Sequence, residues 1–261
     1  RDLHSFPTRR SSDLNAVETD GVNTERKVLS ARVTPWSLPA SCTASPVVPI
    51  VLAHGFNGSP RDFSVIRPFL VTRVTEELRQ AGVSATDAAL CAEPYVHAVS
   101  LGGRDSSATN AKSLLDEYAT VKNLTTKDRI DIIAHSKGGL DSRFFITGFP
   151  LVNNLMMIGT PNGGTPIADV LCAAYNVPAI FSPIIVPIAK RAIEANLGPC
   201  RGPQDALYGI TEDFVRNHVN PLTLENGAVH RTIAGDSSSL QALALTALMG
   251  RSEEHTSELQ S

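Results

Sequence analysis

One stretch of the chain constrains the fold more than any other, because its apolar pattern changes period across a single serine. RIDIIA, at 129–134, is a short apolar run typical of a buried strand, and residues 137–148 follow a helical pattern. Ser136 lies between them in A-H-S-K-G-G. A strand and a helix joined by so short a turn come close together, so the flanking positions need small residues. Gly138 meets this need fully, and Ala134 stands where the strict G-x-S-x-G pattern has glycine.

The rest of the chain shows the same alternation of short apolar runs and helical patterns. Strands are predicted at 47–53, 95–101, 155–160 and 229–235, and helices from Ser59 to Gly82 and at 108–123. Strands that alternate with helices favour a mostly parallel sheet covered by helices on both faces. The sequence therefore predicts an α/β fold.

Residues 165–200 interrupt this alternation. The segment is apolar, is broken by Pro178, Pro183 and Pro187, and is too long for a simple connection, so it predicts one or two helices packed over the edge of the sheet. We interpret it as a lid or substrate-binding cap; the alternative is an ordinary structural insertion. Cys172 and Cys200 bracket the apolar part, which favours a disulfide between them and leaves Cys42 to pair with Cys91. Buried free thiols are the alternative.

The two ends of the chain are set apart from the fold. Residues 1–14 and 251–261 resemble in-frame translations of two standard sequencing-library adapters, and we exclude both from the predicted domain. Genuine polar tails are the alternative. The predicted domain spans 15–250, and we expect the natural protein to continue beyond Gly250 with the last strand or strands of the sheet.

The composition excludes two broad classes of function. The 261 residues carry a net charge of −3, and no basic patch indicates nucleic-acid binding. No apolar run reaches the roughly 18 residues needed to span a membrane. What remains is an ordinary globular composition with 42% hydrophobic residues, enough for one α/β domain.

Three motifs resemble those of the bacterial true lipases and related esterases of the α/β-hydrolase fold. They are LAHGFNGS at 52–59, IDIIAHSKGGLDSRFF at 130–145 and MIGTPNGGTPIAD at 157–169. The resemblance implies hydrolysis of carboxylic esters, often of lipids, at a lipid–water interface and without an organic cofactor. It also implies a secreted or periplasmic protein. Some relatives hold a structural calcium, but the sequence shows no calcium-loop pattern, so we predict no metal site.

Ser136 is the predicted nucleophile, and a helix-capping serine is the alternative. The helix N-terminus behind it favours developing negative charge. We predict that the backbone N–H groups of Phe56 and Lys137 form the oxyanion hole. Asp141 and Arg143, on the helix after the serine, are expected to form a structural ion pair. Supporting roles are predicted for His54, Gly55, His135 and Gly138.

The remaining members of a catalytic triad are harder to find. In this fold the chain order is serine, acid, histidine. Asp236 follows the last predicted strand and is the predicted acid; an ordinary loop aspartate is the alternative. His218 and His230 follow Ser136 but precede Asp236, so we expect the base beyond Gly250 and an inactive 261-residue chain.

Two other kinds of function remain open. A non-catalytic lipid-binding or interaction protein on a hydrolase scaffold predicts that no acid–histidine pair follows Gly250. A thioesterase or polyester depolymerase would use the same triad on another substrate, and substrate profiling would separate these enzymes from an esterase.

Overall fold

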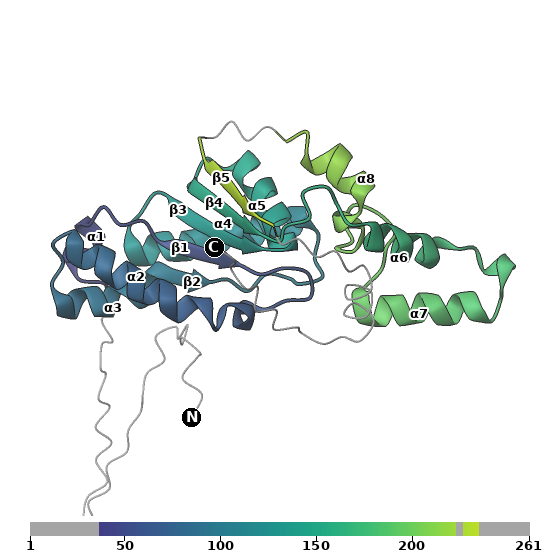
Figure 1. Ribbon diagram of the computed structural model, residues 1–261, viewed down its shortest axis with the longest axis horizontal. Helices are drawn as coiled ribbons and strands as arrows, with labels where there is room; N and C mark the ends of the chain where they lie inside the picture. The colour runs from purple at the N-terminus through teal and green to yellow at the C-terminus, as the bar shows by residue number, and fades with distance from the viewer. Residues whose placement is uncertain (1–36, 223–226, 235–261) are drawn as a thin grey trace, which may run out of the picture. The chain divides into compact units, whose positions relative to one another are not determined.

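The computed structural model describes residues 37–222 and 227–234, which apart from Ser37 belong to one compact unit, Leu38–Ser261. Five strands form one sheet in the order β2-β1-β3-β4-β5, and every neighbouring pair is parallel (Figure 1). The strands are β1 Ile50–Ala53, β2 Val96–Ala98, β3 Ile130–His135, β4 Val152–Ile158 and β5 Val229–Ile233. The parallel α/β sheet predicted from the sequence is confirmed.

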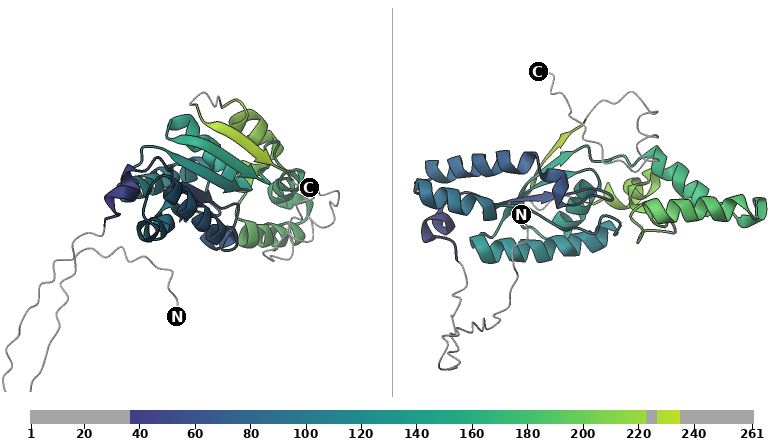
Figure 2. Two further views of the ribbon diagram at one scale, coloured as in Figure 1. Left: turned by 60° about the vertical axis from the view of Figure 1, so that its left-hand side comes forward. Right: turned by 90° about the horizontal axis from the view of Figure 1, so that it is seen from below.

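Helices lie on both faces of the sheet, as Figure 2 shows in its right-hand view. One face packs against α4 Ser107–Thr125 and α5 Lys137–Gly148. The other face, over β1 and β2, packs against α1 Ala40–Ala44, α2 Ile66–Gln80 and α3 Ala85–Tyr95. The alternation of β1 explains this division: Val51 and Ala53 enter the first core, and Leu52 enters the second.

The remaining helical segments follow β4, apart from one short turn after β1. That turn is the 3-10 helix η1 Pro60–Phe63. The later segments are α6 Pro166–Asn176, η2 Ala179–Phe181, α7 Ile185–Leu197, η3 Tyr208–Ile210, α8 Glu212–Phe214 and η4 Val215–Val219. The predicted insertion at 165–200 thus forms two main helices, and α6 and α7 run side by side as a hairpin (Figures 1 and 2).

The hairpin has a packed base and an exposed apolar tip. At the base, Cys172, Tyr175 and Cys200 are buried in a small core that Phe56 also joins. The large apolar side chains at the tip are 64–85% exposed: Ile180, Phe181, Ile184, Ile185 and Ile188. Apolar exposure on this scale at one place indicates a binding surface. No helix in the described part of the chain is long and apolar enough to cross a membrane.

Two disulfides form as the cysteine positions predict. Cys42–Cys91 joins α1 to α3, and Cys172–Cys200 joins α6 to the segment that follows α7. Closing a loop of 28 residues in this way stabilises the fold by about 3 to 4 kcal/mol in the chain-entropy view.

The structure corrects several sequence-based boundaries: β1 begins at Ile50 instead of at 47, and β2 ends at Ala98 instead of at 101. Ser59 caps the 3-10 turn η1, accepting a hydrogen bond from Arg61 N at 3.3 Å, and the long helix begins only at Ile66. Helix α3 was not predicted, and strand β2 starts where it ends. Strand β4 starts at Val152 instead of at 155, because Val152 pairs with Ile130 of β3 ahead of a shift in register. At the shift, the Asn154 side chain and backbone N–H both donate to the Asp131 carboxylate.

Candidate functional site

Ser136 occupies a strained turn between β3 and α5. Its backbone has φ 53° and ψ −128°, a region that serine rarely adopts and that packing must impose. The turn is held by two backbone bonds, from Ser136 N to Ile158 O at 2.9 Å and from Gly139 N to Ser136 O at 3.0 Å. The Ser136 side chain makes no capping hydrogen bond to α5. The hydroxyl is therefore not used as a helix cap, which was the alternative interpretation.

Gly138 allows α5 to approach the end of β1. A Cβ at this position would lie 2.4 Å from Ala53 O and 2.5 Å from His54 O, far inside van der Waals contact. Glycine is thus required for the close packing of helix and strand behind the serine.

The turn at residues 54–58 lies directly against Ser136. A Cβ on Gly55 would stand 2.7 Å from Ser136 Cβ and 3.2 Å from Ser136 Oγ. Asn57, with φ 54°, donates its backbone N–H to Gly103 O at 2.7 Å and so fixes the turn to the loop after β2. Within the described ranges, the backbone N–H groups of Phe56 and Lys137 donate to no protein acceptor.

His54 supports this turn and is fully engaged. It is 1% exposed, and its Nε2 accepts a hydrogen bond from Leu101 N at 3.1 Å. The proton must then sit on Nδ1, which donates to Gly55 O at 3.1 Å. With both ring nitrogens occupied, His54 holds the loop and has no free nitrogen for proton transfer.

A buried ion pair anchors the first turn of α5, but its partners differ from those expected. Lys137 Nζ donates to Asp141 Oδ1 at 2.7 Å, and Asn110 Nδ2 donates to Asp141 Oδ2 at 2.8 Å. Asp141 therefore pairs with Lys137 and not with Arg143. Arg143 instead donates to amide and carbonyl oxygens of Asn162, Asn220 and Val219. Asn110 also bonds Gly102, so the pair ties α5 to the loop after β2.

The side chains of the other described histidines interact with residues other than Ser136. His97 Nε2 lies 2.9 Å from Glu117 Oε2, and the His218 ring lies 5.0 Å from the Phe214 ring. His230 pairs with Leu155, well before the carboxyl end of β4. The His135 side chain is exposed where β3 ends, and partial desolvation of its ring lowers its pKa, with a smaller opposing effect from Asp62. Among the described residues, no histidine hydrogen-bonds the Ser136 hydroxyl.

The predicted acid, Asp236, lies outside the described residues. The strand that precedes it ends close to the serine, because two hydrogen bonds link the carboxyl ends of β3, β4 and β5. Ser136 N donates to Ile158 O, and Gly159 N donates to Ile233 O, each at 2.9 Å.

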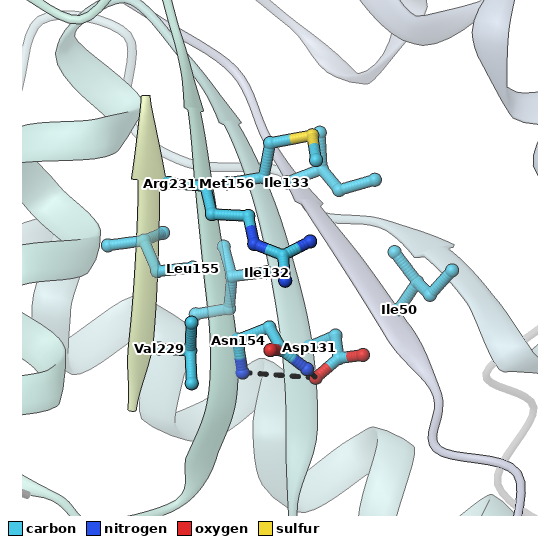
Figure 3. A pocket seen from close by; sticks show the side chains of 9 residues that line it. All are labelled: Ile50, Asp131, Ile132, Ile133, Asn154, Leu155, Met156, Val229 and Arg231. Carbon is cyan, nitrogen blue, oxygen red and sulfur yellow. Dashed lines mark hydrogen bonds between the residues drawn. The ribbon is translucent and has the colours of Figure 1, made fainter. Parts of the chain in front are cut away.

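A hollow of about 400 Å³ lies on the sheet (Figure 3). Its lining includes Asp131 and Arg231, and the Asn154 side chain donates to Asp131 at 2.8 Å. Burial raises the pKa of Asp131, which the hydrogen bonds from Asn154 partly offset. The full lining is Ile50, Asp131, Ile132, Ile133, Asn154, Leu155, Met156, Val229 and Arg231. Ser136 is not among these residues, so the hollow is not the candidate catalytic site.

Comparison with known proteins adds to this geometry. No family model matches the chain. A triacylglycerol lipase from Burkholderia plantarii is 28% identical over 144 residues, 54% of this chain and 37% of the lipase. This chain thus spans little more than a third of that relative.

The solved structures decide the fold. The mature lipase BlEst2 of Bacillus licheniformis superposes with a TM-score of 0.51 at 18% identity, covering 77% of this chain and 72% of the lipase. The chain has the α/β-hydrolase fold. The propeptide form of the same lipase gives a TM-score of 0.50 at 16% identity, over 77% of this chain and 37% of that form.

Proposed function

We propose that the protein is a serine hydrolase that cleaves carboxylic esters, with Ser136 as the nucleophile. The observation that carries this proposal is the left-handed backbone of Ser136 between β3 and α5, with the 54–58 turn packed against its side chain. Such a strained turn persists only where packing over-determines it, and strain of this kind is concentrated at functional sites. The uncommitted hydroxyl and the two nearby backbone N–H groups suit acyl transfer.

The chemistry follows from these positions. Ser136 Oγ attacks the ester carbonyl, its proton passes to a general base, and the new oxyanion accepts hydrogen bonds from the N–H groups of Phe56 and Lys137. The ester C–O bond then breaks and the alcohol leaves with that proton. Water attacks the acyl-enzyme by the same route, releases the carboxylic acid and restores the serine.

The base and acid of this mechanism lie outside the described residues. His54 has both ring nitrogens committed, and the other described histidines contact groups other than Ser136. Asp236 is the proposed acid because it follows Ile233 by three residues, and Ile233 lies near the serine. Ser136 N donates to Ile158 O, and the next residue, Gly159, donates its N–H to Ile233 O. Asp or Glu after such a strand is the usual orienting group in this fold.

The proposed substrates are lipid or other acyl esters met at a lipid surface. The support is the hairpin α6–α7, whose exposed apolar tip would be shielded from water in a lipid layer. The segment 170–193 carries Lys190 and Arg191 and no acidic residue, which favours an anionic surface. Two disulfides favour an oxidising compartment, so we propose a secreted or periplasmic location.

The test begins with the gene. Sequencing beyond the codon for Gly250 should reveal a histidine followed by a final strand, and the protein expressed to its natural end should hydrolyse p-nitrophenyl esters. Ser136→Ala in that protein should abolish turnover, since no nucleophile remains. Turnover retained by the variant would refute the assignment. A complete gene without that histidine would favour a lipid-binding protein on a hydrolase scaffold.

A further inference from the structure

Arg104 connects two parts of the molecule that are far apart in sequence. Its Nε donates to Asn57 Oδ1 at 3.1 Å. Its Nη1 and Nη2 donate to the backbone carbonyls of Ala195 at 3.2 Å and Asn196 at 2.8 Å. One guanidinium thus bonds both the turn beside Ser136 and the end of α7.

The carbonyls that Arg104 binds are ones that a helix leaves unpaired. Helix α7 ends at Leu197, so Ala195 and Asn196 are among the last four carbonyls and have no intrahelical donor. A cation at this end also meets the negative pole of the helix dipole. The planar fork of arginine can reach both carbonyls at once, which a lysine ammonium cannot do in the same geometry. Arg104 therefore caps the carboxyl end of α7, the second helix of the hairpin.

The other partner of Arg104 lies next to the proposed oxyanion donor. Asn57 follows Phe56 directly and holds a left-handed backbone, φ 54°. The Phe56 side chain packs against the small core at the hairpin base, which contains Cys172 and Cys200. The turn is therefore attached to the hairpin on two sides, by an apolar contact from Phe56 and by a polar contact from Asn57 through Arg104.

We propose that Arg104 is a positioning residue that couples the α6–α7 hairpin to the oxyanion hole. By holding Asn57 against the end of α7, it sets the direction of the adjacent Phe56 N–H relative to Ser136. A displacement of the hairpin, for example when its tip meets a lipid surface, then moves this N–H. The catalytic meaning of the coupling rests on the function proposed above, but the physical link between the two segments does not.

The first test measures the link without relying on turnover. In Arg104→Gln, hydrogen–deuterium exchange should become faster both in peptides that contain residues 54–58 and in those that contain residues 191–198. The matched control is Arg129→Gln, which also removes an arginine–asparagine contact, from Arg129 Nη1 to Asn153 Oδ1 at 3.2 Å. Arg129 precedes β3 at the end opposite Ser136, so its loss should leave exchange at both segments unchanged.

A second variant separates the two halves of the link. Asn57→Gly keeps a residue that adopts positive φ readily and removes the side-chain acceptor of Arg104. It should speed exchange at residues 54–58 while α7 remains capped by Arg104. If exchange at 54–58 stays at the wild-type rate in both variants, Arg104 is only a helix cap and the proposal is overturned.

The last test asks whether the link serves catalysis, in the protein expressed to its natural end. Loss of a whole oxyanion donor lowers kcat by a factor of about 100 to 1,000, so a misdirected donor in Arg104→Gln should lower kcat about tenfold, with KM within about twofold. Arg104→Lys should recover part of that loss. A raised KM with unchanged kcat would overturn the proposal, whereas turnover that survives Ser136→Ala would overturn the proposed function and leave the exchange result standing.

Discussion

At the scale of single residues, the contact between Gly55 and Ser136 gives the sharpest prediction. In Gly55→Ala the new methyl group would overlap Ser136 Cβ and press on its Oγ, since the built Cβ stands 2.7 and 3.2 Å from these atoms. The neighbours are a strained turn and a strand end, so they cannot yield without moving the serine. We expect ester turnover by the full-length protein to fall at least a hundredfold, on the scale of a misplaced catalytic group.

The control for this substitution is Gly148→Ala at the end of α5. A Cβ there would meet no atom within 4 Å, so turnover should stay at the wild-type level. The free energy of unfolding, measured in urea, should be unchanged or raised by up to about 1 kcal/mol, the helix preference of alanine over glycine. Equal activity in Gly55→Ala and Gly148→Ala would remove the turn at 54–58 from the site.

The sequence predicted the strand–turn–helix around Ser136 better than the contacts of the side chains on it. The small residues around Ser136 follow from backbone sterics alone, so the strand–turn–helix can be read from neighbouring positions. Asp141 pairs with Lys137, and the sequence predicted Arg143 as its partner. The choice depends on which side chains α5 buries against α4, where Asn110 supplies the second donor to Asp141. A helical pattern gives the spacing of such residues and not the depth to which each is buried.

At the scale of elements, the hairpin tip predicts membrane binding that is independent of catalysis. The double variant Phe181→Ser/Ile184→Ser removes two side chains that are 76% and 73% exposed. Because burying each in lipid is worth about 1.5 to 3 kcal/mol, the variant should partition onto vesicles at least tenfold more weakly. Sedimentation with vesicles of phosphatidylcholine and phosphatidylglycerol measures this, and added phosphatidylglycerol should strengthen binding of the wild type.

A matched control lies on α2. Phe69 is 63% exposed there, outside the hairpin, so Phe69→Ser should sediment with vesicles as the wild type does. If the hairpin variant and the α2 variant bind equally well, the tip is not the lipid-binding surface.

A helix or a disulfide could be predicted only where the neighbouring residues carry a clear sequence signal for it. Helix α5 and the pairing of Cys172 with Cys200 follow from period and cysteine position, and both are present. Helix α3 was missed because its alanine-rich stretch, 85–95, ends in Glu-Pro-Tyr, and proline commonly marks a helix end. Here Pro94 lies in the last turn of α3, where the helix tolerates it. The helix is stabilised by packing against α2 and β2, and this tertiary contact leaves no local signal in the sequence.

At the scale of the whole molecule, the two faces of the sheet differ in how well the described helices cover them. Parallel sheets are normally buried on both faces. Helices α4 and α5 cover one face of β1, β3 and β4, whereas the core under α2 and α3 covers the other face at β1 and β2 and reaches β3 only at Ile133. The second face of β3–β5 carries the hollow of Figure 3, whose lining includes the partly buried Asp131 and the exposed Arg231 beside apolar neighbours. The apolar strand pattern predicted burial on both faces, and it did not reveal this polar region.

A histidine on the face of the sheet that α4 and α5 cover predicts how the free energy of unfolding depends on pH. His230 of β5 lies with both ring nitrogens buried, and among the described residues neither has a hydrogen-bond partner. Burial lowers its pKa below 6.5, and the nearby Arg143 lowers it further. The unfolded chain then binds more protons than the folded one as pH falls from about 6.5 toward the lowered pKa. The free energy of unfolding should therefore decrease over this window, by up to about 1.4 kcal/mol per pH unit. His135 adds to this trend more weakly, because solvent screens its exposed side chain.

Urea unfolding at pH 7.5 and at pH 5.5 measures this effect, and His230→Leu tests its source. Leucine cannot titrate and leaves no unpaired ring nitrogen, so the variant should unfold with a smaller pH dependence and be at least as stable as the wild type at pH 7.5. Thr232→Val, a non-titrating change two residues along the same strand, should keep the wild-type dependence. The raised pKa of Asp131 acts in the opposite direction, since the folded chain binds this proton more readily, and its contribution to stability grows as pH falls through the raised pKa toward 3.8. A wild-type protein equally stable at both pH values would show that His230 accepts a proton in the folded state as readily as in the unfolded chain.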